Sequence, residues 1–290
     1  MKVVGFTFVR NSLRFDYPLL ESIHSLLPLC DEVVVAVGNS EDGTLSLIQK
    51  IGSPKIRIIE TVWDDTLRKG GQVLAVETNK ALAAVAADAD WAIYLQADEV
   101  LHEADYPAIR AGMELWQHDK LVEGLLLNYH HFYGSYDYVG DSYRWYRREI
   151  RVVRPGIGVY SYRDAQGFRR ADNRKLRVKL LDATVFHYGW VKAPAAMHHK
   201  QKTFYKLWHP DDQAPKTVAA AEDFYYQEID SLLRFASTHP ATMQPRIDAR
   251  NWQFDHDISR NRYRLKERFM RVVERLIGYR LGEYRNYQLF

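Results

Sequence analysis

The first hundred residues alternate short runs of β-branched and aromatic residues with stretches of helical periodicity, and this alternation constrains the fold most. The pattern predicts strands at 3–9, 32–37, 56–61 and 91–95, helices at 18–27, 44–51 and 71–87, then a helix at 105–118 and a strand at 122–128. Strands that alternate with helices form a largely parallel sheet joined by crossover helices. The sequence therefore predicts an α/β fold.

The second half of the chain differs from the first in composition and pattern. Residues 129–190 are rich in aromatic and basic side chains, and β-hairpins are expected around 143–153 and 176–185. Helical patterns follow at 193–208, 217–237 and 259–277, with prolines between them, as is typical of separate helices. We expect one α/β domain over residues 1–190 and a helical C-terminal extension over residues 191–290.

Composition excludes several classes of protein. Hydrophobic residues make up 47% and charged residues 27% of the 290 residues, which is typical of a folded domain. Lys and Arg exceed Asp and Glu by 40 − 37 = 3, too small an excess for a surface devoted to nucleic acid. The single cysteine, Cys30, excludes an intramolecular disulfide and a zinc site built from several cysteines.

The predicted location is cytoplasmic. The opening run 3–9 has no small-residue cleavage site after it and is expected to be a strand, not a signal peptide. No stretch of about 18 apolar residues suited to a membrane-spanning helix occurs in the sequence. A lone cysteine agrees with a reducing compartment.

Polar residues follow the fourth predicted strand, where open α/β sheets bind their ligands. Asp98 and Glu99 offer the hard oxygen ligands with which Mn²⁺ or Mg²⁺ bridges a protein and substrate phosphates. His187, at the end of a later predicted strand, is a candidate third ligand. Two solvated acids in a turn and a packing histidine are the alternatives. His130 and His131 lack a zinc-binding context and are expected at the surface.

The loop 38–44, after the second predicted strand, carries acceptors suited to ribose hydroxyls and base edges. These are Asn39, Glu41 and Asp42, between two glycines that permit unusual backbone conformations. An ordinary turn that caps the next helix is the alternative interpretation.

Asp164 is the candidate general base, because it lies between hairpin-like segments among polar and aromatic groups. Glu149 competes with it for this role. The surrounding arginines, seven between residues 147 and 170, suit phosphates or an acidic acceptor. An exposed loop aspartate and a solvated cationic surface are the alternatives.

The segment 258–285 combines nine Lys or Arg residues with regularly spaced apolar residues. A basic amphipathic helix of this kind lies on an anionic bilayer, or its apolar stripe packs on its own domain. The sequence leaves both open, so the protein is either free in the cytoplasm or peripheral on the inner face of the membrane.

Together the motifs VVGFTFVRN, DEVVVAVGNSEDGT and YLQADEVLHE resemble those of a family 2 glycosyltransferase with the GT-A fold. The resemblance is good over residues 1–105 and weaker up to His187. It implies a GT-A-like, mostly parallel sheet flanked by helices, with a nucleotide-binding half at 1–100 and an acceptor half at 101–190.

The resemblance also assigns roles. It implies nucleotide or donor contacts for Phe8, Arg10, Asn11, Asn39, Glu41, Asp42, Gln72, Asn79 and Gln96, and a cation, Mn²⁺ or Mg²⁺, held by Asp98 with Glu99. His187 stays the third ligand suggested by its strand-end position. Gln96 stands where the family's metal motif has its first acid, and glutamine binds ribose better than it binds a divalent cation.

The implied activity is an inverting, hexosyltransferase-like transfer of sugar from a nucleotide-sugar donor to a saccharide or lipid-linked acceptor, in surface polysaccharide biosynthesis, with Asp164 as base. Two alternatives remain. A nucleotidyltransferase on a similar sheet is disfavoured, because Arg10 and Asn11 stand where a Gly-rich phosphate loop with a lysine would. The other is a catalytically silent carbohydrate- or nucleotide-binding protein. Nucleic acid is not an expected partner.

Overall fold

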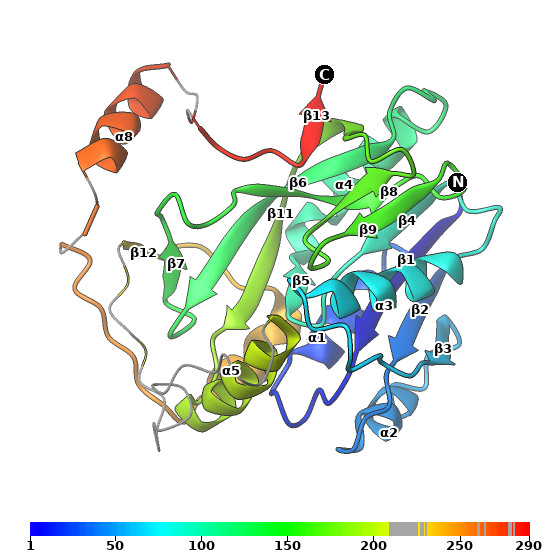
Figure 1. The fold of residues 1–290 in the computed structure, drawn as a ribbon, viewed down its shortest axis with the longest axis horizontal. Helices are drawn as coiled ribbons and strands as arrows, with labels where there is room; N and C mark the ends of the chain where they lie inside the picture. The colour runs from blue at the N-terminus through cyan, green and yellow to red at the C-terminus, as the bar shows by residue number, and fades with distance from the viewer. Residues whose placement is uncertain are drawn as a thin grey trace.

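The computed structural model of the chain describes residues 1–208, 226, 229, 231–259, 262–263, 265–277, 280 and 282–290. Its first half consists of β1 (Val3–Val9), α1 (Leu19–Leu26), β2 (Glu32–Val37), α2 (Thr44–Gln49), β3 (Ile56–Glu60), α3 (Gln72–Ala83) and β4 (Trp91–Tyr94). Strands β4, β1, β2 and β3 lie side by side in that order and run parallel (Figure 1). Each ends within one residue of its predicted end, so this part of the prediction is confirmed.

Glycines begin two of the crossover helices. Gly43 and Gly71, the residues before α2 and α3, have φ of 79° and 69°. This left-handed conformation is strained for residues with a side chain. The glycine at each position therefore lets the chain turn sharply from a loop at the sheet edge into a helix.

The second half widens the sheet. It contains β5 (Glu99–Leu101), η1 (Glu103–Asp105), α4 (Tyr106–Leu115), β6 (Gly124–Tyr133), β7 (Tyr138–Gly140), β8 (Arg148–Val153), β9 (Val159–Tyr162), β10 (Gly167–Arg170) and β11 (Leu176–Trp190). Strand β8 lies between β4 and β6, antiparallel to both, whereas β11 runs parallel to β6. The result is a mixed sheet flanked by helices, the predicted GT-A-like α/β arrangement.

Two hairpin predictions are wrong. Residues 176–190 form one long strand, β11, and 148–153 form the single strand β8, because both pair with distant partners along β6. Such long-range pairing overrides local turn preference. The consecutive antiparallel pairs of this region are β6 with β7 and β9 with β10 instead.

The C-terminal residues contain helices, as predicted, and two strands that were not. They form α5 (Pro194–Trp208), β12 (Leu232–Arg234), η3 (Ala241–Met243), α7 (Gln244–Asp248), α8 (Leu265–Ile277) and β13 (Tyr287–Leu289). Strand β12 pairs with β7, and β13 pairs with β11. Most of the helix predicted at 217–237 lies outside the described residues, but its last part is strand β12. No helix in the described part of the chain is long and apolar enough to cross a membrane.

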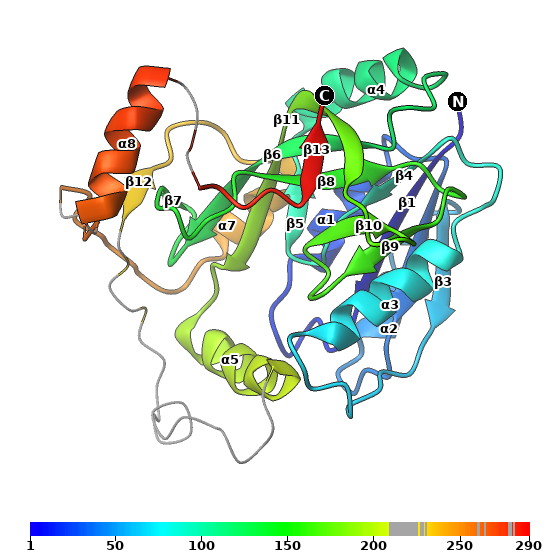
Figure 2. The same cartoon turned by 45° about the horizontal axis from the view of Figure 1, so that its top comes forward.

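Apolar side chains fill both faces of the central sheet. On one face, Leu19, Ile23 and Leu26 of α1 are fully buried, and each such side chain stabilises the fold by roughly 2 kcal/mol. Helix α4 covers the same face. Helix α3 and the β9–β10 hairpin cover the other (Figure 2). With both faces covered, the carboxyl edge of β1, β2 and β4 is the part of the sheet left open for a ligand.

Candidate functional site

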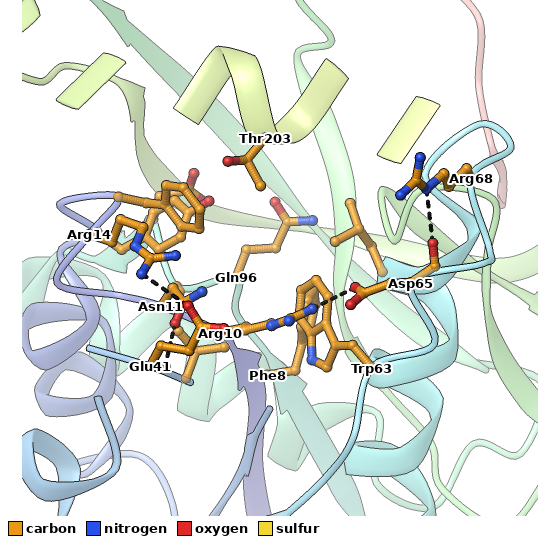
Figure 3. Close-up of a pocket in the computed structure, with 16 residues that line it drawn as sticks. Phe8, Arg10, Asn11, Arg14, Glu41, Trp63, Asp65, Arg68, Gln96 and Thr203 are labelled. Atoms are coloured by element: carbon orange, nitrogen blue, oxygen red, sulfur yellow. Dashed lines mark hydrogen bonds and ion pairs between the residues drawn. The ribbon is translucent and has the colours of Figure 1, made fainter. Parts of the chain in front are cut away.

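A cavity of about 340 Å³ opens at the carboxyl ends of β1, β2 and β4. Of the predicted nucleotide-binding residues, it is lined by Phe8, Arg10, Asn11, Glu41 and Gln96. Thr203 of α5 faces the cavity from the opposite side (Figure 3). We call this space the donor cavity.

An aromatic and cationic group forms one wall of the donor cavity. The rings of Phe8 and Trp63 pack with their centroids 5.8 Å apart, and the guanidinium of Arg10 lies 5.7 Å from the Trp63 ring. Arg10 also donates to Asp65 over 2.7 Å, whereas its Nε is buried without a partner. Trp63 packs so closely on Gly38 that a Cβ there would come within 2.4 Å of its Nε1. The glycine therefore lets the indole lie against the end of β2.

Asn11 joins the loops after β1 and β2. Its backbone N–H donates to Ser40 Oγ over 3.0 Å, and its Oδ1 accepts from the Glu41 N–H over 2.8 Å. Its φ of 56° lies in the left-handed region, which asparagine tolerates better than most residues. Asn11 thus sets the position of Glu41 at the cavity wall, where Glu41 pairs with Arg14 over 3.1 Å.

Four predicted donor residues do not line the cavity. Asn39 Oδ1 accepts from the Trp63 N–H, and Asp42 Oδ1 accepts from the N–H and the hydroxyl of Thr44, the first residue of α2. Gln72 is exposed at the start of α3. Asn79 holds the β9 strand by accepting from the Ser161 N–H over 2.6 Å. Asn39 therefore supports the cavity wall, while Asp42 and Asn79 hold neighbouring elements.

A second cavity, of about 330 Å³, adjoins the first and shares Leu74, Gln96 and Asp98 with it. Its walls include Trp145, Tyr146 and Trp190, and we call it the acceptor cavity. Aromatic faces of this kind suit the apolar faces of sugar rings. The two cavities meet at the polar residues that end β4.

Asp164 lines the acceptor cavity from the turn between β9 and β10. Its neighbours Arg163 and Ala165 have φ of 56° and 65°, a conformation that is costly for residues other than glycine. Gln96 Nε2 donates to the Ala165 carbonyl over 3.2 Å. This hydrogen bond ties the turn that carries Asp164 to the end of β4.

Glu99, predicted as a metal ligand, does not take that role in the structure. Its carboxylate is fully buried and accepts two hydrogen bonds from the Arg151 guanidinium, over 2.7 and 2.8 Å. Tyr129 and the backbone N–H of Gln96 donate to the same carboxylate. With both oxygens engaged, Glu99 fixes the turn after β4, and the prediction is corrected.

Asp98 and His187 remain together in the acceptor cavity, 3.8 Å apart at the closest approach of carboxylate and imidazole. His131 Nε2 donates to the Tyr146 carbonyl over 2.8 Å, and burial lowers the pKa of His131 well below its usual value. Neutral His131 therefore accepts at Nδ1 from His187 Nδ1 over 3.0 Å. This leaves the Nε2 lone pair of His187 on the side of Asp98.

A carboxylate and an imidazole, completed by substrate phosphate oxygens, fit Mn²⁺ or Mg²⁺. Asp98 and His187 therefore fit the predicted cation, with His131 orienting the imidazole. Within the described residues, no group of three or more His, Cys, Asp or Glu side chains is arranged to hold a metal. Asp98 and His187 therefore stay predicted ligands, whereas Glu99 does not.

Glu149, the alternative base, is buried beneath the acceptor cavity wall. Gln166 Nε2 donates to its Oε1 over 2.6 Å, while Oε2 has no partner. Burial raises the pKa of Glu149 from 4.5 to about 8. The folded chain therefore holds this carboxyl protonated at neutral pH, where the unfolded chain has lost the proton.

Because the pKa of Glu149 is raised on folding, stability should fall as pH rises from about 4.5 to about 8. Glu149→Gln keeps a neutral side chain with an acceptor for Gln166. We expect this variant to flatten the dependence of the free energy of unfolding on pH and to be more stable than wild type by about 4 kcal/mol at pH 8. Urea unfolding at several pH values measures this, with the exposed Glu114→Gln as control. Parallel curves for wild type and Glu149→Gln would contradict the expectation.

Sequence reasoning missed several residues of the two cavities. Trp63 and Lys200 were not singled out, and His131, expected at the surface, is buried and lines the acceptor cavity. Trp63 could have been noticed as a tryptophan in the mostly polar stretch after the third strand. Lys200 could not, because lysines are common on amphipathic helices.

Comparisons with known proteins identify no family for the chain. No family model matches it, and no curated protein matches it. Among solved structures it is similar to S. aureus TarS 1–349 in complex with UDP, with TM-score 0.41 and 14% identity over 70% of this chain and 64% of that one. Across three TarS structures, the chain spans 36% to 64% of their length.

Two further structures are similar over part of the chain. Glucosyl-3-phosphoglycerate synthase from Mycobacterium tuberculosis, in complex with Mg²⁺ and UDP, gives TM-score 0.31 and 18% identity over 46% of this chain and 43% of that one. 4-Diphosphocytidyl-2C-methyl-D-erythritol synthase from Anaerococcus prevotii gives TM-score 0.39 and 12% identity over 71% and 94%. Similarities this distant assign neither a family nor a function, so membership of glycosyltransferase family 2 stays a prediction.

Proposed function

We propose that the chain is a nucleotide-sugar-dependent glycosyltransferase. The observation that carries this proposal is the pair of adjoining cavities, which meet at Gln96 and Asp98 on the carboxyl edge of the sheet. A transferase needs two sites whose reactive ends touch, one for the donor and one for the acceptor. Residues 8–98 supply nearly all of one cavity and residues 131–201 most of the other, which supports the predicted halves.

The donor cavity is suited to a nucleoside. Phe8 and Trp63 offer aromatic surface to a base, and Arg10 adds a cation whose Nε has no partner among the described residues. Glu41 presents a carboxylate of the kind that accepts hydrogen bonds from ribose hydroxyls. We assign the base to the Trp63 side and the diphosphate to the side of Gln96 and Asp98.

The proposed chemistry is an inverting displacement. The acceptor oxygen forms a bond to the anomeric carbon while the bond from that carbon to the diphosphate oxygen breaks. Asp164 takes the proton of the acceptor hydroxyl, and the nucleoside diphosphate leaves with the bonding electrons. Asp98 and His187 would hold a divalent cation, which would supply positive charge to the leaving diphosphate. Gln96 keeps Asp164 beside the reacting groups through the Ala165 carbonyl.

The finer assignments extend the same proposal. Trp145, Tyr146 and Trp190 suit a saccharide or the sugar of a lipid-linked acceptor, and the donor is proposed to carry a hexose. Surface polysaccharide assembly on the cytoplasmic side of a membrane is the proposed process.

The test of this proposal is turnover. The chain is incubated with UDP-, GDP-, CDP- and dTDP-linked sugars, and release of the nucleoside diphosphate is measured. We expect release from one nucleotide class. Binding without release would favour a silent binding protein, and pyrophosphate release from a nucleoside triphosphate with a sugar phosphate would favour a nucleotidyltransferase. Either result would overturn the proposal.

Trp63→Ala should weaken binding of the nucleotide to the donor cavity. Stacking of a base on an aromatic side chain contributes about 1–3 kcal/mol, so the dissociation constant should rise about tenfold or more. The neighbouring Val62 is 71% exposed, and Val62→Ala is the matched control. Isothermal calorimetry measures both. Equal affinities for the two variants would place the base elsewhere.

A further inference from the structure

A lysine stands where the two cavities meet, and neither the fold nor the predicted motifs assign it a role. Lys200 of α5 lines the acceptor cavity, and its ammonium donates to Asp98 Oδ2 over 3.2 Å and to the Gly189 carbonyl over 2.9 Å. It also lies 5.2 Å from the ring of Tyr17, which lines the donor cavity. Its charge is therefore placed at the junction, within reach of both spaces.

Other ionisable side chains lie close to Lys200. Burial alone raises the pKa of Asp98, but the ammonium of Lys200 above all holds that pKa well below its usual range. Lys192 is fully buried, donates to the Asp16 carbonyl over 2.7 Å and lies 4.8 Å from the same Tyr17 ring. Burial lowers the pKa of Lys192 to about 7, so Lys192 adds only part of a positive charge to that of Lys200 where an anion would bind.

Helix α5 places the ammonium of Lys200 at the carboxyl edge of the sheet. Thr203 on the same helix faces the donor cavity one turn beyond Lys200 (Figure 3), and residues three apart share one side of a helix. The side of α5 that bears Lys200 and Thr203 therefore faces the open edge between the cavities.

We propose that Lys200 binds the diphosphate of the donor and supplies a fixed positive charge there in addition to any divalent cation. This rests on the proposed function and adds a binding residue to it. An ammonium at this junction contacts phosphate oxygens as a point charge. The diphosphate should therefore bind better than the monophosphate even when no divalent cation is present.

The experiment compares the affinity of nucleoside mono- and diphosphates in EDTA, using UMP and UDP, GMP and GDP, CMP and CDP, and dTMP and dTDP. Wild type should prefer the diphosphate of one pair by about tenfold. Lys200→Ala should lose this preference, Lys200→Arg should keep most of it, and Lys202→Ala, at an exposed position of α5, should keep all of it.

Two outcomes would overturn the role of Lys200 while leaving the proposed function standing. One is a wild type that binds a diphosphate only with Mn²⁺ or Mg²⁺, and the other is an unchanged preference in Lys200→Ala. Failure of every nucleotide to bind, with or without a cation, would instead overturn the proposed function together with this inference.

An independent observation concerns α8, which stands away from the sheet (Figure 1). Arg271 pairs with Asp141 over 2.6 Å, and Glu274 pairs with Arg147 over 2.7 Å. Tyr143 donates to Glu274 over 3.0 Å. These contacts hold the polar side of the helix against the protein and thereby fix its rotation.

The opposite side of α8 is apolar and open to solvent. Leu265, Phe269, Val272 and Leu276 are spaced by three or four residues and have exposed fractions between 54% and 83%. Such spacing places them in one stripe. We call these four residues the α8 stripe. In the part of the chain that the structure describes, the stripe therefore does not pack on its own domain.

The exposed charges of α8 indicate which kind of surface would bind the α8 stripe. Lys266, Arg268 and Arg275 are exposed on α8, whereas its two acids, Glu267 and Glu274, are both partly buried. Exposed cations beside an exposed apolar stripe complement an anionic lipid surface. A second copy of the chain would bring the same positive charge to the contact.

We infer that α8 lies in the surface of an anionic membrane, with the α8 stripe inserted among the lipids. The test is sedimentation with vesicles of phosphatidylcholine, with or without phosphatidylglycerol. Wild type should sediment with the anionic vesicles only, and less at high salt. The double variant Phe269→Ser, Leu276→Ser should lose binding by about tenfold or more.

The control carries the same change on another surface, at Leu115 and Leu121, which are 70% and 55% exposed. Leu115→Ser with Leu121→Ser should bind the vesicles like wild type. Equal binding of the two double variants would overturn the inference, as would absence of binding to anionic vesicles. A dimer in analytical ultracentrifugation that Phe269→Ser with Leu276→Ser abolishes would also overturn it, because a second copy would then cover the stripe.

Discussion

Arg151→Met should lower the free energy of unfolding by about 3–5 kcal/mol, the usual cost of leaving a buried charge without its partner. Arg151 and Glu99 are both fully buried and joined by two hydrogen bonds. The guanidinium also donates to the Ile150 and Gln166 carbonyls, and it lies about 5 Å from the rings of Tyr94 and Tyr129. Urea unfolding followed by tryptophan fluorescence measures the loss.

The control is an arginine that forms an ion pair at the surface. Arg57 pairs with Glu32, and both side chains are partly exposed, so Arg57→Met should cost no more than about 1 kcal/mol. Adding Glu99→Gln to Arg151→Met should restore part of the stability, because no unpaired charge stays buried. Similar losses for Arg151→Met and Arg57→Met would contradict this account of the network.

Asp164→Asn should reduce turnover of the nucleotide sugar by about 10²- to 10⁴-fold, the usual contribution of a general base. The amide has nearly the same shape but cannot take the proton of the acceptor hydroxyl. Because Asp164 lines only the acceptor cavity, the affinity for the nucleoside diphosphate should change less than about twofold. The rate of nucleoside diphosphate release and calorimetry separate the two quantities.

Two variants control this result. Asp172→Asn changes an exposed aspartate in the next turn of the chain and should leave turnover unchanged. Glu149→Gln removes the competing base and should also retain turnover, because Glu149 lies behind Gln166, outside both cavities. A loss confined to Glu149→Gln would reassign the base.

The strands of the first half were predictable because their signal is local. Each buried strand is a short apolar run, and the polar residues after β4 follow from the rule that open sheets bind ligands at their carboxyl edge. That rule also placed Gln96 and Asp98 correctly at a cavity. Asp164 likewise lies in a turn that joins two hairpin strands, although the strands themselves were predicted elsewhere.

The rest depended on contacts between residues far apart in the chain. Glu99 was predicted as a ligand because its partner, Arg151, lies 52 residues away in sequence. Lys200 reaches Asp98 across 102 residues, through the path of α5 over the sheet edge. A local sequence pattern does not show where distant strands and helices meet. Neither the contact of Glu99 with Arg151 nor that of Asp98 with Lys200 could therefore be predicted from the sequence.

The measurement that tests the central claim most directly is a calorimetric titration of the chain with UDP, GDP, CDP and dTDP, each with Mn²⁺, Mg²⁺ or EDTA. We propose that a nucleoside binds beside Phe8 and Trp63 and that its diphosphate lies beside Asp98. One of the four should therefore bind, with an affinity that Trp63→Ala weakens and Val62→Ala does not. The transferase proposal is contradicted if none of the four binds. It is also contradicted if Trp63→Ala binds the nucleotide as tightly as wild type does, because the donor cavity is then not a nucleotide site.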